Sequence, residues 1–146
     1  MISPEDIYYM KQALTEAAEA ARCNEVPIGA IVVCHKRIIA RAHNLTETLN
    51  DVTAHAEMQA ITAAANALGG KYLNDCTLYV TVEPCVMCAG AIAWAQMGRV
   101  VFGTPDEKRG FNRYAPHALH PKTVVDSGVL TDECRQLMKD FFRQKR

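Results

Sequence analysis

CTLYVTVEPCVMCAGAIAWAQM, residues 76–97, joins a strand pattern directly to a helix pattern. Residues 76–82 have an alternating and β-branched character, which predicts a strand, and Pro84 ends it. The small and apolar residues that follow predict a helix that begins at or just after Pro84. Helices interleaved with strands in this way are typical of α/β proteins.

The sequence on both sides of this stretch continues the alternation. Apolar residues repeat at helical spacing after Pro4, two β-branched runs flank a short charged turn as in a hairpin, and Gly69 and Gly70 close an Ala-rich helix. Thr131 is the expected N-cap of the C-terminal helix. The predicted elements are a helix over 4–24, strands over 28–35 and 37–44, a helix over 55–68, a strand over 76–84, a helix over 85–97, a strand over 99–103, a long loop over 104–121 with room for a short helical turn, an edge strand over 122–130 and a helix over 131–146. This order predicts a two-layer or three-layer α/β sandwich with a mixed sheet.

The length and composition of the chain fit one compact domain. Its 146 residues, 49% of them hydrophobic, are enough to bury a core, so we expect a single domain over 1–146. No apolar run approaches the roughly 18 residues that cross a bilayer, and the first residues are acidic where a signal peptide would be basic. We therefore expect a soluble, cytoplasmic protein with no membrane partner.

The charge is balanced overall but unevenly distributed. Sixteen basic residues match sixteen acidic ones, so the net charge gives no sign of a nucleic-acid partner. From residue 108 onward, however, nine basic residues stand against four acidic ones. One interpretation is a surface that attracts a polyanion, and the other is simply a solvated C-terminal helix.

The cysteines fall into two groups. A framework of disulfides is not expected in a chain with a full-sized core and no secretory signal. Four cysteines stand alone in apolar or helical stretches and are expected to be buried thiols: Cys23, Cys34, Cys76 and Cys134. Cys85 and Cys88 are different, because residues three apart at a helix start can direct both sulfurs to one point, where the helix N-terminus favours thiolate.

A lone Cys-x-x-Cys motif has several interpretations: a redox dithiol, half of a four-cysteine zinc site, or coincidence. The chain has no second Cys-x-x-Cys, and this one does not follow the first strand of its unit as a thioredoxin-type motif does. His55, at another predicted helix start, can supply a third ligand. Two cysteines and one histidine leave the fourth tetrahedral position open, which is typical of catalytic zinc, and Glu57 would then stand beside the metal as a proton carrier.

His-x-Glu at 55–57 followed by Pro-Cys-x-x-Cys at 84–88 is the signature of zinc nucleobase deaminases. With TAHAEM and TLYVTVEPCVMCAGAI, the chain resembles the cytidine and deoxycytidylate deaminase superfamily, and more closely the bacterial tRNA-specific adenosine deaminases. The similarity runs from about Tyr8 to the C-terminus through EVPIGAIVV, AHN, RVVFG, D-x-K-x-G, GVL and DFFRQKR. It implies the cytidine deaminase-like fold, a three-layer α/β/α sandwich with a central mixed five-stranded sheet.

The resemblance also implies an activity and the residues that carry it. The activity is the hydrolytic conversion of adenosine to inosine at the wobble position of a tRNA anticodon, with one Zn²⁺ per subunit and a homodimer as the assembly. By resemblance the metal ligands are His55, Cys85 and Cys88, the proton carrier is Glu57, and the nucleoside-binding residue is Asn44. The resemblance also implies that Pro27 and Ile28 form the apolar side of the base pocket, and that the backbone amides near Ala54 and from Pro84 to Cys85 help to fix the base and its developing charge.

The C-terminal part of the chain is where RNA contacts are expected. The resemblance places the Phe142–Arg143 end beside splayed anticodon-loop bases, and Asp106 and Lys108 at the rim of the site. Phe142 could instead simply dock the last helix on the sheet. The loop over 111–121 is shorter than in the commonest family form, so family contacts are not carried over to it, and its two histidines, His117 and His120, are expected not to bind zinc.

Two other functions are open to the sequence. A deaminase of a free base or nucleoside, of the guanine or cytosine type, would keep the zinc chemistry but would not need an extended basic rim. A non-catalytic, zinc-stabilised RNA-binding module would not need Glu57 beside the metal.

Overall fold

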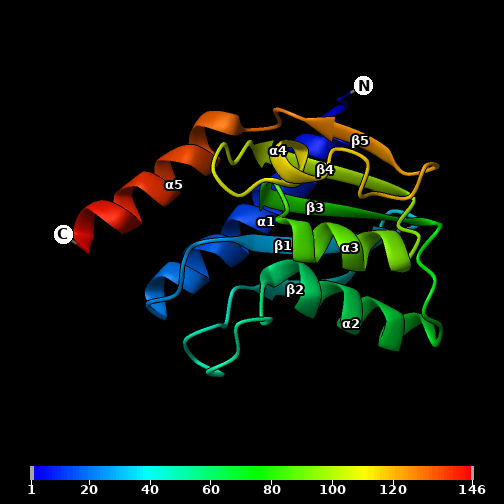
Figure 1. Cartoon of the computed structure of the whole chain (residues 1–146), viewed down its shortest axis with the longest axis horizontal. Helices are drawn as coiled ribbons and strands as arrows, with labels where there is room; N and C mark the ends of the chain where they lie inside the picture. The colour runs from blue at the N-terminus through cyan, green and yellow to red at the C-terminus, as the bar shows by residue number, and fades with distance from the viewer. Residues whose placement is uncertain (1, 146) are drawn as a thin grey trace.

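The computed structural model describes residues 2–145 and consists of a five-stranded sheet with helices on both faces (Figure 1). The strands lie in the order β2-β1-β3-β4-β5. In chain order the elements are α1 (Pro4–Arg22), β1 (Gly29–Cys34), β2 (Arg37–His43), α2 (Ala56–Leu68), β3 (Cys76–Val82), α3 (Val86–Trp94), β4 (Arg99–Thr104), α4 (Phe111–Tyr114), β5 (Val124–Ser127) and α5 (Thr131–Gln144).

The sheet is mixed, as the sequence predicts. β1 pairs antiparallel with β2 and with β3, whereas β3, β4 and β5 run parallel. Parallel neighbours need a crossover, and α3 supplies it between β3 and β4. The junction at Pro84 therefore places the start of α3 at the carboxyl end of β3, which is the edge of an α/β sheet where ligands usually bind.

Successive side chains of β1 point to opposite faces of the sheet and so belong to two different hydrophobic cores. Ala30 and Val32 pack with α2 and α3, while Ile31 and Val33 pack with α1 and with the start of α5. In Figure 1, α2 and α3 lie in front of the sheet and α1 behind it. The prediction of a three-layer α/β/α sandwich is confirmed.

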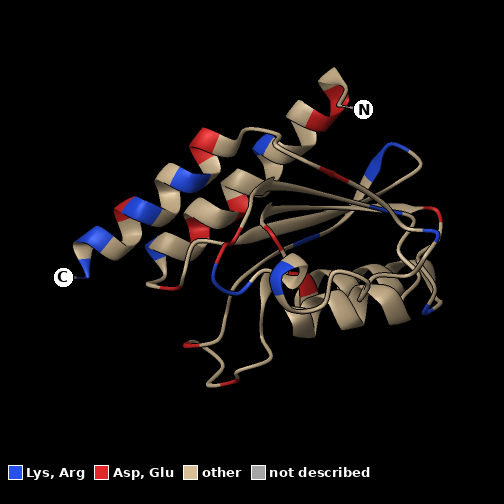
Figure 2. Ribbon diagram, turned by 45° about the horizontal axis from the view of Figure 1, so that its top comes forward, with Lys and Arg blue, Asp and Glu red and all other residues tan. Residues whose placement is uncertain are grey.

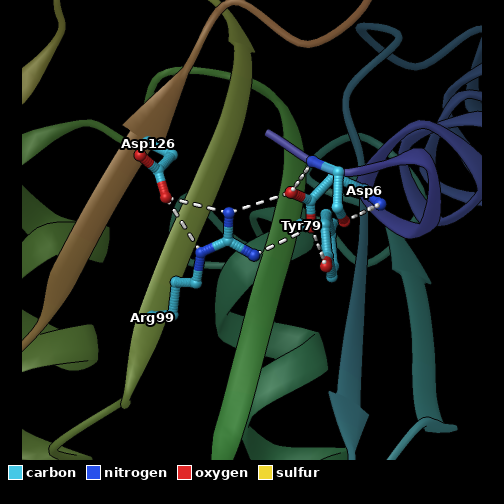
Figure 3. A network of polar contacts seen from close by, with 5 residues as sticks. Asp6, Tyr79, Arg99 and Asp126 are labelled. Carbon is cyan, nitrogen blue, oxygen red and sulfur yellow. Dashed lines mark hydrogen bonds and ion pairs between the residues drawn. The ribbon is translucent and has the colours of Figure 1, made fainter. Parts of the chain in front are cut away.

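Four polar side chains join the first helix to the edge strand β5 across one face of the sheet (Figure 3). The buried Asp6 carboxylate accepts hydrogen bonds from the Tyr79 hydroxyl at 2.6 Å and from Arg99 at 2.8 Å. Arg99 also contacts Asp126 of β5 at 2.8 Å. Because Arg99 lies beside it, the pKa of Asp6 is held well below its usual range.

Two details differ from the sequence prediction. Thr131 is not the N-cap of α5: Leu130 holds that position with a φ of 56°, and the Thr131 hydroxyl donates to the Gly103 carbonyl of β4 at 2.8 Å. Cys23 is exposed, because it follows the last turn of α1 as its C-cap, whereas the other three isolated thiols are buried. Within residues 2–145, none of the helices is long and apolar enough to span a bilayer.

Candidate metal and nucleobase site

The site forms where the first turns of α2 and α3 meet. His55 is the N-cap residue of α2, and Cys85 is the N-cap residue of α3. Cys88 lies in the first turn of α3, so its sulfur and that of Cys85 are on the same side of the helix end. The sequence separates the histidine from the cysteines by about thirty residues, and the packing of the two helices side by side on one face of the sheet removes that separation.

The distances among these three side chains fit a zinc ion. His55 Nδ1 lies 3.6 Å from Cys85 Sγ and 3.5 Å from Cys88 Sγ. A tetrahedral zinc ion with bonds of about 2.3 Å to sulfur and about 2.0 Å to nitrogen separates those ligands by about 3.5 Å. In the described part of the chain this is the one group of histidine, cysteine and carboxylate side chains that could hold a metal ion.

The two thiols differ in acidity. The pKa of Cys85 is lowered to about 4 by its hydrogen bond with the Cys88 thiol, by the neighbouring His55 and by the backbone N–H at the start of α3. The pKa of Cys88 is raised above its usual value because it shares that hydrogen bond and is buried. The start of α3 therefore favours a thiolate, which is the form of cysteine that binds a cation.

Glu57 lies beside the metal ligands with its side chain 4% exposed. It is the second residue of α2, in the first turn after the N-cap histidine. Burial raises the pKa of its carboxyl to about 7. Its carboxylate interacts with the Cys88 thiol, which places a proton-accepting group at the ligand cluster without making it one of the ligands.

A cleft of about 770 Å³ opens onto this group. Of the residues that the sequence singles out, the cleft wall contains Ile28, Asn44, His55, Glu57, Cys85, Asp106, Lys108 and Phe142. The wall therefore includes residues from the loop after β2, both helix starts, the loop after β4 and α5. It combines a metal-binding end with an apolar side, a hydrogen-bonding amide and charged residues at its rim.

Three of the residues predicted to contact the base are not in the cleft wall: Pro27, Ala54 and Pro84. Pro27 is buried, and Val26 and Ile28 on either side of it line the cleft. The Ala54 N–H donates to the Asp51 carbonyl at 3.1 Å, so it is already used within the loop. Pro84 has no N–H to offer, and its carbonyl accepts from the Phe111 N–H at 2.9 Å.

A second hollow of about 520 Å³ adjoins the cleft along α5. Its wall contains Arg135, Lys139 and Arg143 and shares Asp106 and Phe142 with the cleft. Figure 2 shows basic residues spaced along α5 toward the C-terminus. The aromatic ring of Phe142, 45% exposed, thus stands between the metal end and a basic surface. Arg146, counted with the basic residues above, lies outside the described residues.

Sequence reasoning missed two buried carboxylates at the cleft: Glu83, which is in its wall, and Glu25, which is not. Glu83 accepts hydrogen bonds from the Asp106 N–H at 3.1 Å and the Asn112 N–H at 3.0 Å, which fixes the loop after β4. A signal is present in the sequence, since both acids are next to the Val-Pro or Pro-Cys residues of the motifs. It identifies a charge in an apolar setting and does not identify the loop amides that satisfy it.

The match to a family model covers nearly the whole chain. Residues 5–146 match the MafB19-like deaminase family. The tRNA-specific adenosine deaminase of Bacillus subtilis (strain 168) is 46% identical, over 97% of this chain and 91% of that protein.

Solved structures agree with this family match. The structure of a tRNA:A34 deaminase, from work on A-to-I editing at the wobble position, superposes with a TM-score of 0.83 and 43% identity over 89% of this chain and 98% of that one. A guanine deaminase from Nitrosomonas europaea has a TM-score of 0.82 over 97% of this chain and 85% of that one, at 23% identity, and so shares the fold. The chain belongs to the MafB19-like deaminases, and its similarity in sequence and structure to tRNA-specific relatives groups it with the tRNA-specific adenosine deaminases.

Proposed function

We propose that the protein is a zinc-dependent hydrolase that converts adenosine to inosine at the wobble position of a tRNA anticodon. The observation that carries this proposal is the meeting of His55, Cys85, Cys88 and Glu57 at one end of a cleft whose other end is aromatic and basic. The tRNA-specific names of the relatives at 46% and 43% identity support the choice of substrate. A cytoplasmic place of action follows from that substrate and is part of the proposal.

His55, Cys85 and Cys88 would hold the zinc ion, because their nitrogen–sulfur distances match a tetrahedral site and their donor set is one that zinc prefers. Bound there, zinc would supply a Lewis acid that activates water for attack on carbon 6 of the purine. The overall reaction adds one water and releases one ammonia.

Glu57 would move the protons of this reaction. It would accept a proton from the attacking water, deliver it to the ring nitrogen, and assist the departure of the amino group as ammonia. Asn44 would hydrogen-bond the target nucleoside from the opposite side of the cleft, while Val26 and Ile28 would pack against the base. Such walls suit a base that has been turned out of its stack.

The rim would bind the rest of the anticodon loop. Phe142 offers a ring on which an unpaired base can stack, and Arg143, Lys139 and Lys108 offer positive charge for its phosphates. Asp106 lies between the two hollows, where a ribose hydroxyl could donate to it. A free purine would leave this whole rim unused, which favours the RNA over a free base.

We also propose that two chains associate through α3. Its outward face presents Val86, Met87 and Trp94 to solvent, and Trp94 is 85% exposed. A methyl group added at Gly90 on this helix would meet no atom within 4 Å, so a partner helix could approach closely there. Apolar faces of this kind mark protein–protein interfaces, and a homodimer would bury this one.

Inosine formation on an anticodon stem-loop RNA, assayed with and without a zinc chelator, tests the proposal. We expect activity that chelation abolishes, and a Glu57→Ala variant that is inactive while its zinc content and melting temperature stay close to those of the wild type. Full turnover by Glu57→Ala would contradict the proposed proton transfer. Deamination of free guanine or cytosine, with none on the stem-loop, would instead establish the small-molecule alternative.

A further inference from the structure

Glu25 is a fully buried acid, 0% exposed, that the proposed chemistry does not use. The end of α1 fixes its position. Asn24 adopts a left-handed φ of 63°, its N–H donates to the Ala21 carbonyl, and the Glu25 N–H reaches back to the Ala20 carbonyl at 2.9 Å. This pair of bonds is the Schellman motif, which leaves the residue after the turn little freedom.

The Glu25 carboxylate is satisfied by the loop that follows β2. It accepts hydrogen bonds from the Thr48 N–H at 2.6 Å, the Thr48 hydroxyl at 2.6 Å and the Glu47 N–H at 3.1 Å. Burial would raise the pKa of Glu25, but these bonds outweigh it and the pKa lies below its usual value. An ionised carboxylate therefore holds the loop from inside the protein.

The same carboxylate faces the side chain of Asn44. The Asn44 Nδ2 group lies 3.5 Å from Glu25 Oε1 and 3.4 Å from Thr46 Oγ1. The reversed amide would direct its oxygen at the carboxylate and would be repelled. Asn44 is 6% exposed and lines the cleft, so the charge behind it determines which edge of the amide meets the substrate.

We propose that Glu25 is a positioning residue for the deaminase reaction, which fixes the orientation of the Asn44 amide and the course of the 44–51 loop beside it. The proposal rests on the function proposed above, because it assigns Asn44 to the target nucleotide. Glu25 itself does not line the cleft and does not contact the reacting atoms. Its contribution passes through Asn44.

A double-mutant cycle of Glu25→Gln and Asn44→Ala, assayed on the anticodon stem-loop, tests this dependence. We expect Glu25→Gln to lower kcat/KM about tenfold in the wild-type background and less than about twofold in the Asn44→Ala background, as coupled residues do. Asp6→Asn is the control for lost stability, because it alters a buried carboxylate of α1 that does not line the cleft. We expect its kcat/KM to stay within about twofold of the wild type.

A second readout does not depend on turnover. In a ¹H–¹⁵N spectrum, the side-chain NH₂ signals of Asn44, identified by their loss in Asn44→Ala, should shift or broaden in Glu25→Gln and stay in place in Asp6→Asn. Equal losses of kcat/KM in both backgrounds, or unchanged Asn44 signals, would overturn the positioning role. An inactive wild-type chain would overturn the proposed function instead, and the Asn44 signals would still decide the effect of Glu25 on that amide.

Discussion

At the scale of single residues, the donors that face a buried carboxylate decide its role. In the described part of the chain Asp6 faces a guanidinium, Glu25 and Glu83 face loop amides, and Glu57 faces the ligand cluster. Amide donors fix a loop without neutralising the charge, whereas a guanidinium forms an ion pair that joins elements. Of these four carboxylates, Glu57 is the one for which we propose proton transfer.

Asp6 gives a prediction about acid stability. Its folded pKa is lowered, so its contribution to stability is complete above the unfolded pKa of about 4, decreases as the pH falls below that value, and is fully lost only below the folded pKa. Between pH 7 and pH 3, the wild type should lose about 1 kcal/mol more free energy of unfolding than Asp6→Asn. Urea unfolding at the two pH values measures this difference. Equal losses in both proteins would show that Arg99 does not stabilise the ionised form.

At the scale of elements, the loop between β4 and α4 has its position set by one glycine and one acid. A methyl group on Gly110 would lie 2.3 Å from the Glu83 carboxyl carbon, although the Gly110 φ of −62° suits any residue. The constraint is therefore close packing and not backbone conformation. The loop carries Asp106 and Lys108 into the cleft, so its position bears on substrate binding.

Gly110→Ala should accordingly displace this rim loop and leave the metal ligands in place. We expect kcat/KM on the stem-loop to fall about tenfold or more, with the free energy of unfolding lowered by about 1–3 kcal/mol and about one zinc ion retained per chain. Gly70→Ala is the matched control, because a methyl group there meets no atom within 4 Å. Activity of Gly110→Ala equal to that of the control would mean that the rim tolerates the shift.

The elements were predictable from sequence where local pattern and packing agree. The hairpin of β1 and β2, the closure of α2 at Gly69 and the start of α3 after Pro84 match the prediction within about two residues. Thr131 is not the N-cap of α5, because its hydroxyl instead donates to the Gly103 carbonyl of β4, a strand distant in sequence. Capping rules describe local competition only, and a tertiary partner can override them.

The candidate site was also predictable only where local sequence pattern determines it. The gathering of His55, Cys85 and Cys88 beside Glu57 could be predicted because spacing and residue type together are typical of one kind of site. The hydrogen bonds of the Ala54 N–H and the Pro84 carbonyl could not be predicted, because they depend on how the loops fold. The motif identifies Glu25 only as a charge in an apolar setting, and its role could not be predicted because its partners lie in a loop more than twenty residues away.

At the scale of the whole molecule, the exposed face of α3 predicts the assembly. The wild type should sediment with twice the 16.1 kDa mass of one chain, and Trp94→Glu should reduce it to one, because a buried unpaired charge opposes association. Tyr8→Glu, an equivalent change at an exposed aromatic on α1, should leave the mass unchanged. A Trp94→Glu protein of undiminished mass would exclude α3 as the interface.

The uneven charge of the molecule predicts how RNA binding depends on salt. Each phosphate that a basic side chain contacts releases counterions, so the logarithm of the association constant falls with the logarithm of salt concentration, by about 0.7 per contact on a single strand. Arg143→Ala and Lys139→Ala, on the wall beside Phe142, should each make this slope shallower by about that amount.

Arg37→Ala is the control for this measurement, because Arg37 begins β2 at the end of the strand opposite Asn44. Its slope should equal that of the wild type. Phe142→Ala should weaken binding with no change of slope, since stacking involves no counterion release. Fluorescence anisotropy of a labelled stem-loop from about 50 to about 300 mM salt separates the two effects. An unchanged slope in both α5 variants would show that this helix does not contact the phosphates, and that its positive charge only keeps the surface solvated.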